Sequence, residues 1–508
     1  MDAELRERML AMGIDVERSQ EILDKLNAGR YDTVTPLEAD GLPEIDGETI
    51  IDRRGETQYA LDEQQYLAVL ADLAPEIPRE AFGEQVDGKR RLRQEDLRQI
   101  GTLLYPYLSY GVLNGGSATS YADTRKNSSY SEQLMELYRD DFQRMAEACR
   151  GRPKGITPAF VNPDGSDGAS FLELKFRMLL LAGERYRQLA EDLGVEPPRD
   201  AKGQPLEPGL PFTEMTSQFT HEALREAYTA YRDSPFIRDL RGAERALDTA
   251  AAQQPLLAAM THSREGRPKD FFTHAWGESG RPLGIPGGHG QNFQVMAPIY
   301  RELRSRGKRF LYMGNVDNIG FTIDPVSLAI LALSGRQAGF DFAFRTPVDV
   351  KGGILVYDQD GTLTCGDIGP AISKEAVLQA EERGTRILFN CATGLFNLDD
   401  LTGRLDHLID DLPMRISDQD KDAGSYSQAE QVTWEVIGLL ERPLIFGIDK
   451  YRRFLAAKML LETLLTSGRH KQRAAAIQST THELSEGLAQ VLREEYGLVQ
   501  RNGRWQPG

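Results

Sequence analysis

The stretch that begins at Gly111 constrains the fold most, because it has the pattern of a buried strand that ends in an anion-holding loop. Gly111, Val112 and Leu113 form a short apolar run, which suits a buried parallel strand. Gly115 and Gly116 follow, and glycine has no Cβ atom to keep backbone N–H groups away from phosphate oxygens. The same pattern is also typical of a plain turn. It therefore predicts either a phosphate-binding loop or a turn at the end of a strand.

Composition and charge exclude several classes of protein. The chain has 508 residues, 40% of them hydrophobic and 27% charged, which is enough for one large core with accessory domains. Its formal net charge of -17 opposes nucleic acid or an anionic membrane as a general partner. The sequence shows neither a secretory signal nor an apolar run of about 18 residues that could span a bilayer. Cys149, Cys365 and Cys391 are scattered, so we expect reduced thiols in a cytoplasmic protein.

The pattern of apolar residues divides the chain into three segments. Residues 1–100 have apolar residues at helical spacing, which predicts a helical N-terminal segment. In residues 101–410, short β-rich runs alternate with helical patterns, which predicts an α/β fold with a mixed, mostly parallel, Rossmann-like sheet. Residues 411–508 are predicted to be a C-terminal helical segment. Ligands of such a sheet bind at the carboxyl ends of its strands.

A hairpin is predicted near the middle of the chain. The apolar run 353–357 and the run 362–364 flank Asp360-Gly361, a dipeptide that favours a tight two-residue turn. Such a hairpin would present Lys351 at its base.

Seven short motifs occur in a fixed order along residues 110–460. They are Leu113–Thr119, Pro153-Lys154-Gly155, Met215-Thr216-Ser217, Gly288-His289-Gly290, Asn315-Val316-Asp317-Asn318, Val350–Gly353 and Arg453–Lys458. This series resembles the UDP-sugar pyrophosphorylase family, and within it the UTP-glucose-1-phosphate uridylyltransferases. Their pattern is L-x-G-G-x-G-T, P-K-[SG], M-[TN]-S, G-H-G, N-[IV]-D-N, V-K-G-G and R-F-L-x-x-K.

The resemblance implies a role for individual residues. It implies that residues 101–410 form a nucleotidyltransferase catalytic domain. It also implies that Lys154 and Lys458 are catalytic residues that offset phosphate charge. Lys458 would let the C-terminal segment complete the active site. Asp317 follows an apolar run, where a strand-end carboxylate can hold Mg²⁺, and the resemblance implies this metal role. The implied substrate contacts are Leu113, Gly115, Gly116, Thr119, Met215, Thr216, Gly288, His289, Asn318, Lys351 and Asn390, with Ser117 and Asn315 as weaker candidates.

Several of these residues also have a purely structural interpretation. Asp317 would then cap the following helix, and Met215 and Thr216 would belong to a buried strand without ligand contact. Lys351 and Lys458 would pair with protein carboxylates, since an unpaired buried ammonium is costly. We do not expect His289 to act as a general base, because the attacking sugar phosphate oxygen is already ionised at neutral pH.

The chain departs from the family pattern at four places. Ala118 replaces the third glycine, and residues 120–152 separate the glycine loop from Pro153, so that Lys126 competes with Lys154 for the role of the loop lysine. The motif around Asn390 is changed. The carboxyl terminus shows helical spacing in place of the β-helix repeat of the eukaryotic members. We therefore expect a monomer or a small homo-oligomer.

The activity implied by the resemblance is the reversible formation of UDP-glucose and pyrophosphate from UTP and glucose 1-phosphate. The sugar phosphate would attack the α-phosphate in line, with Mg²⁺ as cofactor and without a covalent intermediate. Two alternatives are a UDP-N-acetylhexosamine pyrophosphorylase and a catalytically silent sugar-nucleotide-binding protein. The G-H-G and V-K-G-G motifs resemble the glucose enzymes more closely, and the presence of Lys154, Asp317 and Lys458 argues against a silent protein.

Overall fold

A ten-stranded mixed sheet forms the centre of the molecule. The computed structural model describes residues 2–31, 39–118, 121–123, 132–346, 349, 352–470 and 478–508. The main strand order is β1-β18-β12-β15-β11-β5-β6-β7, and β13 and β14 extend the sheet beside β15. These strands are β1 (Ile50–Asp52), β5 (Leu108–Leu113), β6 (Thr213–Ser217), β7 (Ala250–Gln254), β11 (Phe310–Asn315), β12 (Ala338–Phe344), β13 (Gly353–Tyr357), β14 (Leu363–Asp367), β15 (Leu388–Asn397) and β18 (Leu444–Ile448).

Most of these strands run in one direction. The pairs β1–β18, β18–β12, β11–β5, β5–β6 and β6–β7 are parallel, whereas β15 is antiparallel to both β11 and β12. The predicted α/β class with a mixed, mostly parallel sheet is confirmed. The carboxyl ends of the parallel strands lie along one edge of the sheet, and the first residues of β15 lie at that same edge.

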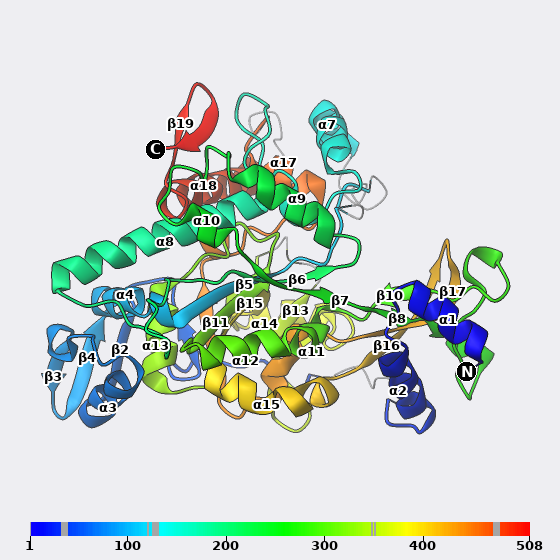
Figure 1. Ribbon diagram of the computed structural model, residues 1–508, viewed down its shortest axis with the longest axis horizontal. Helices are drawn as coiled ribbons and strands as arrows, with labels where there is room; N and C mark the ends of the chain where they lie inside the picture. Colours follow the sequence, from blue (N-terminus) through cyan, green and yellow to red (C-terminus); the bar gives the residue numbers. More distant parts are fainter. Residues whose placement is uncertain are drawn as a thin grey trace.

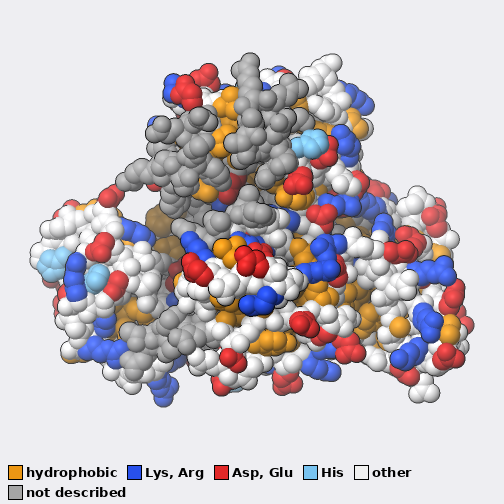
Figure 2. All heavy atoms as spheres, turned by 180° about the vertical axis from the view of Figure 1, so that it is seen from behind, with side chains coloured by type: hydrophobic (Ala, Val, Ile, Leu, Met, Phe, Trp, Pro, Cys, Tyr) orange, Lys and Arg blue, Asp and Glu red, His pale blue; other side chains and the backbone are white. Residues whose placement is uncertain are grey.

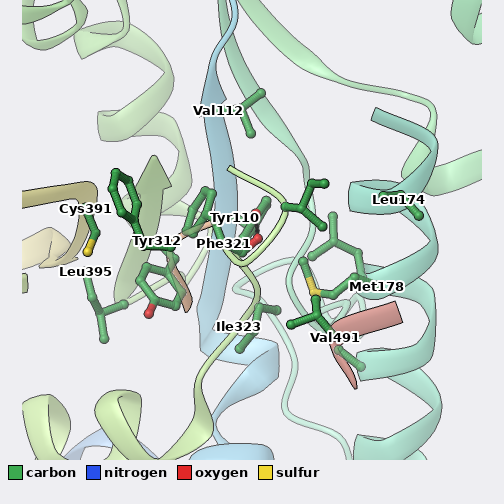
Figure 3. Close-up of a cluster of buried hydrophobic side chains, with 14 of the residues drawn as sticks. Tyr110, Val112, Leu174, Met178, Tyr312, Phe321, Ile323, Cys391, Leu395 and Val491 are labelled. Carbon is green, nitrogen blue, oxygen red and sulfur yellow. Dashed lines mark hydrogen bonds between the residues drawn. The ribbon is translucent and has the colours of Figure 1, made fainter. Parts of the chain in front are cut away.

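Helices cover both faces of the sheet, because its strands are apolar on both sides. Successive residues of β11 show this, since Phe310 and Tyr312 enter one buried cluster and Leu311 and Met313 enter another. The first cluster, partly drawn in Figure 3, lies under α8 (Phe171–Leu193), α17 (Leu460–Thr466) and α18 (Gln478–Glu494). The second lies under α12 (Ala297–Ser305) and α15 (Leu398–Asp411), on the opposite face (Figure 1).

The N-terminal segment is not only helical, which corrects the sequence expectation. The expected helices are present as α1 (Ala3–Ala11), α2 (Val16–Asn27), α3 (Glu63–Leu73) and α4 (Gln94–Leu103). However, β1 is an edge strand of the main sheet, and β2 (Gln58–Asp62), β3 (Glu84–Val86) and β4 (Lys89–Arg93) form a separate small sheet. Strands of three to five residues are too short to give a clear alternation in sequence, and their pairing partners are remote.

The C-terminal segment also contains strands. The predicted helices are present as α17 and α18, but β18 lies inside the main sheet, β16 (Arg415–Lys421) pairs with β17 (Gly424–Glu430), and β19 (Leu498–Arg501) pairs with β20 (Arg504–Pro507). The charged sequence after Arg469 predicts a solvated tail, and this prediction is wrong for the described part of the tail. Leu492 and Tyr496 are fully buried. These side chains complete the core under α8 and α18, so the tail belongs to the folded body.

A smaller lobe lies at one end of the sheet, on the right in Figure 1. It combines α1, α2, β16 and β17 with β8 (Leu256–Ala258), β9 (Met260–Thr261) and β10 (Gly284–Pro286), and it has its own buried clusters. Figure 2 shows Lys, Arg, Asp and Glu side chains interspersed over the back of the molecule. Among the described residues, no helix has the length and hydrophobicity needed to cross a membrane. The three cysteines are buried and free, as expected.

The predicted hairpin is present as β13 and β14, with a longer turn than expected. The last pair is Tyr357 with Leu363, so the turn spans residues 358–362. Asp358 Oδ1 accepts hydrogen bonds from the N–H groups of Asp360 (3.0 Å) and Thr362 (2.8 Å), and this favours the wider turn. Lys351, expected at the base of the hairpin, lies outside the described residues.

We expect a monomer or a small homo-oligomer in solution. The described apolar side chains of the C-terminal segment, among them Leu488, Val491 and Leu492, are buried within their own chain and are not left for a neighbouring subunit. Light scattering coupled to size-exclusion chromatography on the full-length protein is the measurement. A large, concentration-independent oligomer would contradict the expectation.

Candidate functional site

The predicted site residues follow strands whose carboxyl ends are adjacent. In the sheet register, Leu113 at the end of β5 pairs with Met215 of β6 and with Asn315 of β11. Thr393, in the middle of the antiparallel β15, pairs with Gly314 near the end of β11, so the start of β15 lies beyond that end. The glycine loop, the segment after β6, the Asp317 loop and Asn390 therefore all lie at one edge of the sheet. This is the edge at which ligands of parallel sheets bind.

The long insertion returns the chain to the glycine loop. The N–H group of Ala118 donates to the carbonyl of Arg152 (2.9 Å), and the N–H of Lys154 donates to the carbonyl of Gly116 (3.1 Å). The insertion contains α6 (Glu132–Leu137) and α7 (Arg139–Cys149). Its two ends are thus held side by side, and Lys154 is placed next to the loop although it is remote in sequence. The competing Lys126 lies outside the described residues.

The two glycines of the loop face different surroundings. A Cβ atom built on Gly115 would lie 3.1 Å from Gln254 Oε1, so this glycine allows close packing against the end of β7. A Cβ atom on Gly116 would meet no described atom within 4 Å. Ser217 Oγ donates to the carbonyl of Gly115 (2.9 Å) and holds the loop to β6. The loop is therefore fixed on one side and open at Gly116, as an anion-binding loop requires.

Lys154 joins three of the predicted motifs. Its Nζ lies 2.7 Å from Asp317 Oδ2, with the two side chains 12% and 17% exposed. The same ammonium donates to the carbonyl of Ala457 and lies 4.6 Å from the centre of the Tyr121 ring. Ala457 in turn donates its N–H to the carbonyl of Asp317 (3.1 Å). A cation and a carboxylate from distant parts of the chain thus meet beside the glycine loop.

Lys458 projects from the segment next to this pair. Its side chain is exposed, and its Nζ lies 5.9 Å from the centre of the Phe389 ring. Its backbone N–H donates to Glu462 Oε2 (2.9 Å), which fixes the backbone while leaving the ammonium at the edge of the sheet. Among the described residues, no carboxylate lies within ion-pair distance of Nζ. The structure does not show the expected alternative of a protein carboxylate partner for Lys458.

Asn318 is positioned to support the loop and does not face the open edge. It is 1% exposed; its Nδ2 donates to the carbonyl of Arg453 (3.0 Å), and its Oδ1 accepts from the N–H groups of Gly320 and Leu455, both at 3.0 Å. All these partners are backbone groups. The substrate contact expected for Asn318 is therefore corrected to a positioning role, because burial and these hydrogen bonds leave its amide no access to a ligand.

Two buried residues that the sequence analysis missed support the loop that carries Asp317 and Asn318. Lys175 of α8 is fully buried, and its Nζ donates to the carbonyls of Asn318 and Phe321, both at 2.6 Å. Removal from water lowers the pKa of Lys175 well below its ordinary value. Asp341 of β12 pairs with Arg453 (2.8 Å). A lone lysine in an apolar helix and an aspartate inside the Phe-Asp-Phe strand pattern are signals that could have identified both.

Lys175→Met is expected to reduce turnover as well as stability. The change removes two hydrogen bonds, at a cost of about 0.5–1.5 kcal/mol each, and loosens the loop that carries Asp317. Each carbonyl keeps one other donor, the Tyr110 hydroxyl at Phe321 and the Phe321 N–H at Asn318. Lys308→Met is the matched control, because Lys308 is 3% exposed and also donates to backbone carbonyls, those of Pro106, Leu108 and Glu207, at the other edge of the sheet. Thermal melting and steady-state kinetics are measured on both. Equal losses of kcat at equal stability would refute a specific role for Lys175.

Asp317 could hold a magnesium ion only if substrate phosphate oxygens supply further ligands. The described residues contain no group of three or more His, Cys, Asp and Glu side chains arranged to hold a metal. Mg²⁺, however, is commonly held by one or two carboxylates together with phosphate oxygens and water. The capping alternative for Asp317 is wrong, because the next helix, α13 (Pro325–Ser334), is capped by Asp324. Asp317 is thus a strand-end carboxylate without a role in starting a helix.

The Gly288 loop is held against the end of β7. Gly288 has φ +81, and a Cβ atom there would lie 2.3 Å from the carbonyl oxygen of Gln431, so only glycine fits. Gln254 Nε2 donates to the carbonyl of Gly288 (2.7 Å) and to Gln291 Oε1 (2.7 Å). Gln254 Oε1 also lies next to Gly115, 3.1 Å from where a Cβ atom would stand, so Gln254 is adjacent to both glycine loops. Its place at the end of an Ala-rich run before Pro255 is the signal that sequence reasoning missed.

His289 is a neutral ring held against Thr433. Its Nδ1 accepts the N–H of Thr433 (3.0 Å). Burial lowers the pKa of His289 to about 4, and the charge of Arg415 acts in the same direction. The ring is therefore neutral at pH 7, with Nδ1 as a hydrogen-bond acceptor.

The remaining predicted residues divide into buried, half-buried and undescribed ones. Leu113, Met215 and Thr216 are buried, and Thr216 Oγ1 lies 3.1 Å from His221 Nδ1. For Met215 and Thr216 this agrees with the buried-strand interpretation, in which they support the loop. Asn390 is half-buried and accepts the N–H of Ala392 (2.8 Å) at the same edge. Thr119 and Lys351 lie outside the described residues.

Comparisons with known proteins show what the chain is similar to. Residues 278–486 match the family model described as UTP–glucose-1-phosphate uridylyltransferase. A curated relative from Schizosaccharomyces pombe, described as a probable UTP–glucose-1-phosphate uridylyltransferase, is 23% identical over 233 residues. The match covers 45% of this chain and 39% of the relative, so it spans less than half of either protein.

Two solved structures share the fold. A UDP-glucose pyrophosphorylase from Leishmania major, solved in open and closed forms, has 15% identity and a TM-score of 0.52, with 92% of this chain and 79% of that chain covered. An Entamoeba histolytica protein described as a UDP-N-acetylglucosamine pyrophosphorylase has 14% identity and a TM-score of 0.51, with 82% and 90% covered. At these identities the matches support the fold alone.

Proposed function

We propose that the chain is a member of the UDP-sugar pyrophosphorylase family and that it forms UDP-glucose and pyrophosphate from UTP and glucose 1-phosphate. One observation carries the proposal. Lys154, Asp317 and the Ala457-Lys458 segment converge beside a glycine loop that is open at Gly116. A triphosphate needs such a combination of backbone donors, fixed cations and a carboxylate.

The proposed reaction follows from the charges at this edge. An oxygen of the sugar phosphate, already ionised at neutral pH, attacks the α-phosphate of UTP in line, so no general base is required. Lys154 lies where it would offset the charge that grows on the leaving pyrophosphate. Lys458, which has no described carboxylate partner, would offset the charge of the second phosphate group. A neutral His289 is consistent with this, because a base at that position is not needed.

Asp317 is the residue that would hold Mg²⁺ in the substrate complex. When bound, the ion would neutralise phosphate charge between the two substrates. The carboxylate that would hold it is paired with Lys154, so Lys154 orients Asp317 towards the glycine loop. Lys154 is also bound to the carbonyl of Ala457, so it holds Asp317 next to the segment that carries Lys458.

The sugar specificity rests on short motifs, and an assay decides it. The Gly288-His289-Gly290 loop and the Val350–Gly353 motif favour glucose 1-phosphate over the N-acetylhexosamine phosphates. Pyrophosphate release is measured with UTP, TTP and GTP, each combined with glucose, galactose and N-acetylglucosamine 1-phosphates. We expect the highest kcat/KM for UTP with glucose 1-phosphate. Turnover only with N-acetylglucosamine 1-phosphate would replace the proposed substrate, and binding without release would indicate a silent protein.

We propose a cytoplasmic location, where these substrates are available.

A further inference from the structure

Arg415 binds two carboxylates that come from different parts of the fold. It is the first residue of β16, in the smaller lobe. Its Nε and Nη2 donate to Glu435 Oε1 at 2.9 and 2.6 Å, and its Nη1 donates to Asp367 Oδ2 at 2.9 Å. Glu435 lies in η7 (Thr433–Leu439), and Asp367 is the last residue of β14. One planar guanidinium group thus joins three elements.

Glu435 connects this guanidinium group to the Gly288-His289-Gly290 loop. Thr433, two positions earlier, donates its N–H to His289 Nδ1 (3.0 Å) and its Oγ1 to the carbonyl of His289 (2.9 Å). The carbonyl of Gln431 accepts the N–H of Gly290 (2.9 Å). The loop therefore rests on the chain segment that leads to Glu435.

Asp367 connects the same guanidinium group to the base of the β13–β14 hairpin. It pairs with Gly353, the first residue of β13, in the register of the hairpin. Cys365, two positions earlier on β14, accepts a hydrogen bond at Sγ from Asn390 Nδ2 (3.4 Å). The hairpin base therefore adjoins Asn390, an implied substrate contact. Arg415 joins this base to the Gly288-His289-Gly290 loop.

The hairpin depends on Arg415 more than the loop does. Among the described residues, β13 pairs with the neighbouring strand β15 at one position, Ile354 with Phe389. The Gly288-His289-Gly290 loop is held from the other side as well, because Gln254 Nε2 donates to the carbonyl of Gly288 (2.7 Å). Loss of the guanidinium group is therefore expected to displace the hairpin base and to leave the loop in place.

Without Arg415, three carboxylates would face one another. Burial raises the pKa of Glu435; the charge of Arg415 opposes this rise, and the charges of Asp367 and Glu430 add to it. Both contacts of Arg415 with Glu435 are to Oε1, and Oε2 has no hydrogen-bond partner among the described residues. Removal of Arg415 would leave this buried carboxylate unpaired and repelled by the other two.

We propose that Arg415 is a positioning residue for the sugar 1-phosphate, an inference that rests on the proposed function. The glycine loop follows β5 and Asp317 follows β11, whereas β15 and the hairpin lie on the other side of β11. With the triphosphate at the glycine loop, the second substrate lies towards β15 and the hairpin base. Arg415 acts on it through Asp367, by holding the hairpin base against η7.

Steady-state kinetics of Arg415→Gln test this role, because glutamine lacks the charge and cannot bind both carboxylates. We expect the KM for glucose 1-phosphate to rise about tenfold or more, while the KM for UTP and kcat change by less than about threefold. The matched control is Arg309→Gln. Arg309 also joins two carboxylates, Asp72 (3.0 Å) and Asp399 (3.2 Å), but at the opposite edge of the sheet. An unchanged KM for glucose 1-phosphate, equal changes in both KM values, or the same rise in the control overturns the proposal.

The double variant Arg415→Gln/Glu435→Gln separates charge repulsion from a general loss of folded protein. It also removes the carboxylate charge that the single variant leaves unpaired. We expect the KM for glucose 1-phosphate to return to within about threefold of the wild type. A double variant that melts like the wild type and keeps the raised KM would refute the electrostatic reason.

Amide hydrogen exchange tests the link without turnover. Exchange at residues 363–368 is expected to increase in Arg415→Gln and to stay unchanged in Arg309→Gln, with little change at residues 287–290 in either variant. Unchanged exchange at residues 363–368 refutes the link. The two possible failures are distinguishable. A wild type that forms no UDP-glucose overturns the proposed function and the sugar role with it, whereas an active wild type whose KM does not depend on Arg415 overturns this inference alone.

Discussion

Lys154→Ala is expected to lower kcat by about 10²–10³, which corresponds to roughly 2.7–4 kcal/mol of transition-state stabilisation. The ammonium lies beside the glycine loop, where charge would grow on the leaving pyrophosphate, and alanine removes it without adding a new group. The same change breaks the 2.7 Å contact with Asp317 and the bond to the Ala457 carbonyl. Steady-state kinetics with saturating UTP and glucose 1-phosphate measure the effect.

The control for this prediction is Lys126→Ala, because Lys126 is the competing lysine of the sequence pattern. We expect it to have a much smaller effect on kcat. The opposite ranking would show that the wrong lysine was assigned. A melting curve of each variant separates a loss of chemistry from a loss of folded protein, since Lys154 also holds three chain segments together.

Asp317→Asn is expected to abolish magnesium-dependent turnover while the protein stays folded. Asparagine keeps the size of the side chain and can still accept from Lys154 Nζ, but it loses the charge that attracts a divalent cation. Activity is measured over a titration of Mg²⁺, together with the melting temperature. Full activity in the variant would remove Asp317 from the site.

A matched control is Asp399→Asn. Asp399 is also ion-paired, with Arg304 and Arg309, but it lies at the start of α15, at the opposite edge of the sheet. We expect the Mg²⁺ dependence of this variant to be that of the wild type. An equal loss of activity in both variants would point to a general effect of charge removal.

Local patterns predicted those features that depend on neighbours in sequence. The apolar run before Gly115 is β5, and the run before Asp317 is β11, because a buried parallel strand needs consecutive apolar residues whatever its partners are. The N-terminal helices α1 and α2 and the hairpin after Gly353 follow from periodicity and turn residues in the same way. Strands β1 and β18 were missed, since a short apolar run can equally be part of a helix.

The sequence by itself determined the α/β class. It also determined that the glycine loop, Lys154, Asp317 and Lys458 lie in segments next to the ends of strands. Only the tertiary structure decided which of these groups meet. Lys154 and Asp317 are 163 residues apart and form an ion pair because the sheet register and the closed insertion bring their segments together. The same reason explains why Asn318 became a buried support and why Lys175 escaped notice. The spacing of apolar residues in the sequence indicates which residues are buried. Which residues contact one another depends on how segments that are remote in sequence pack together.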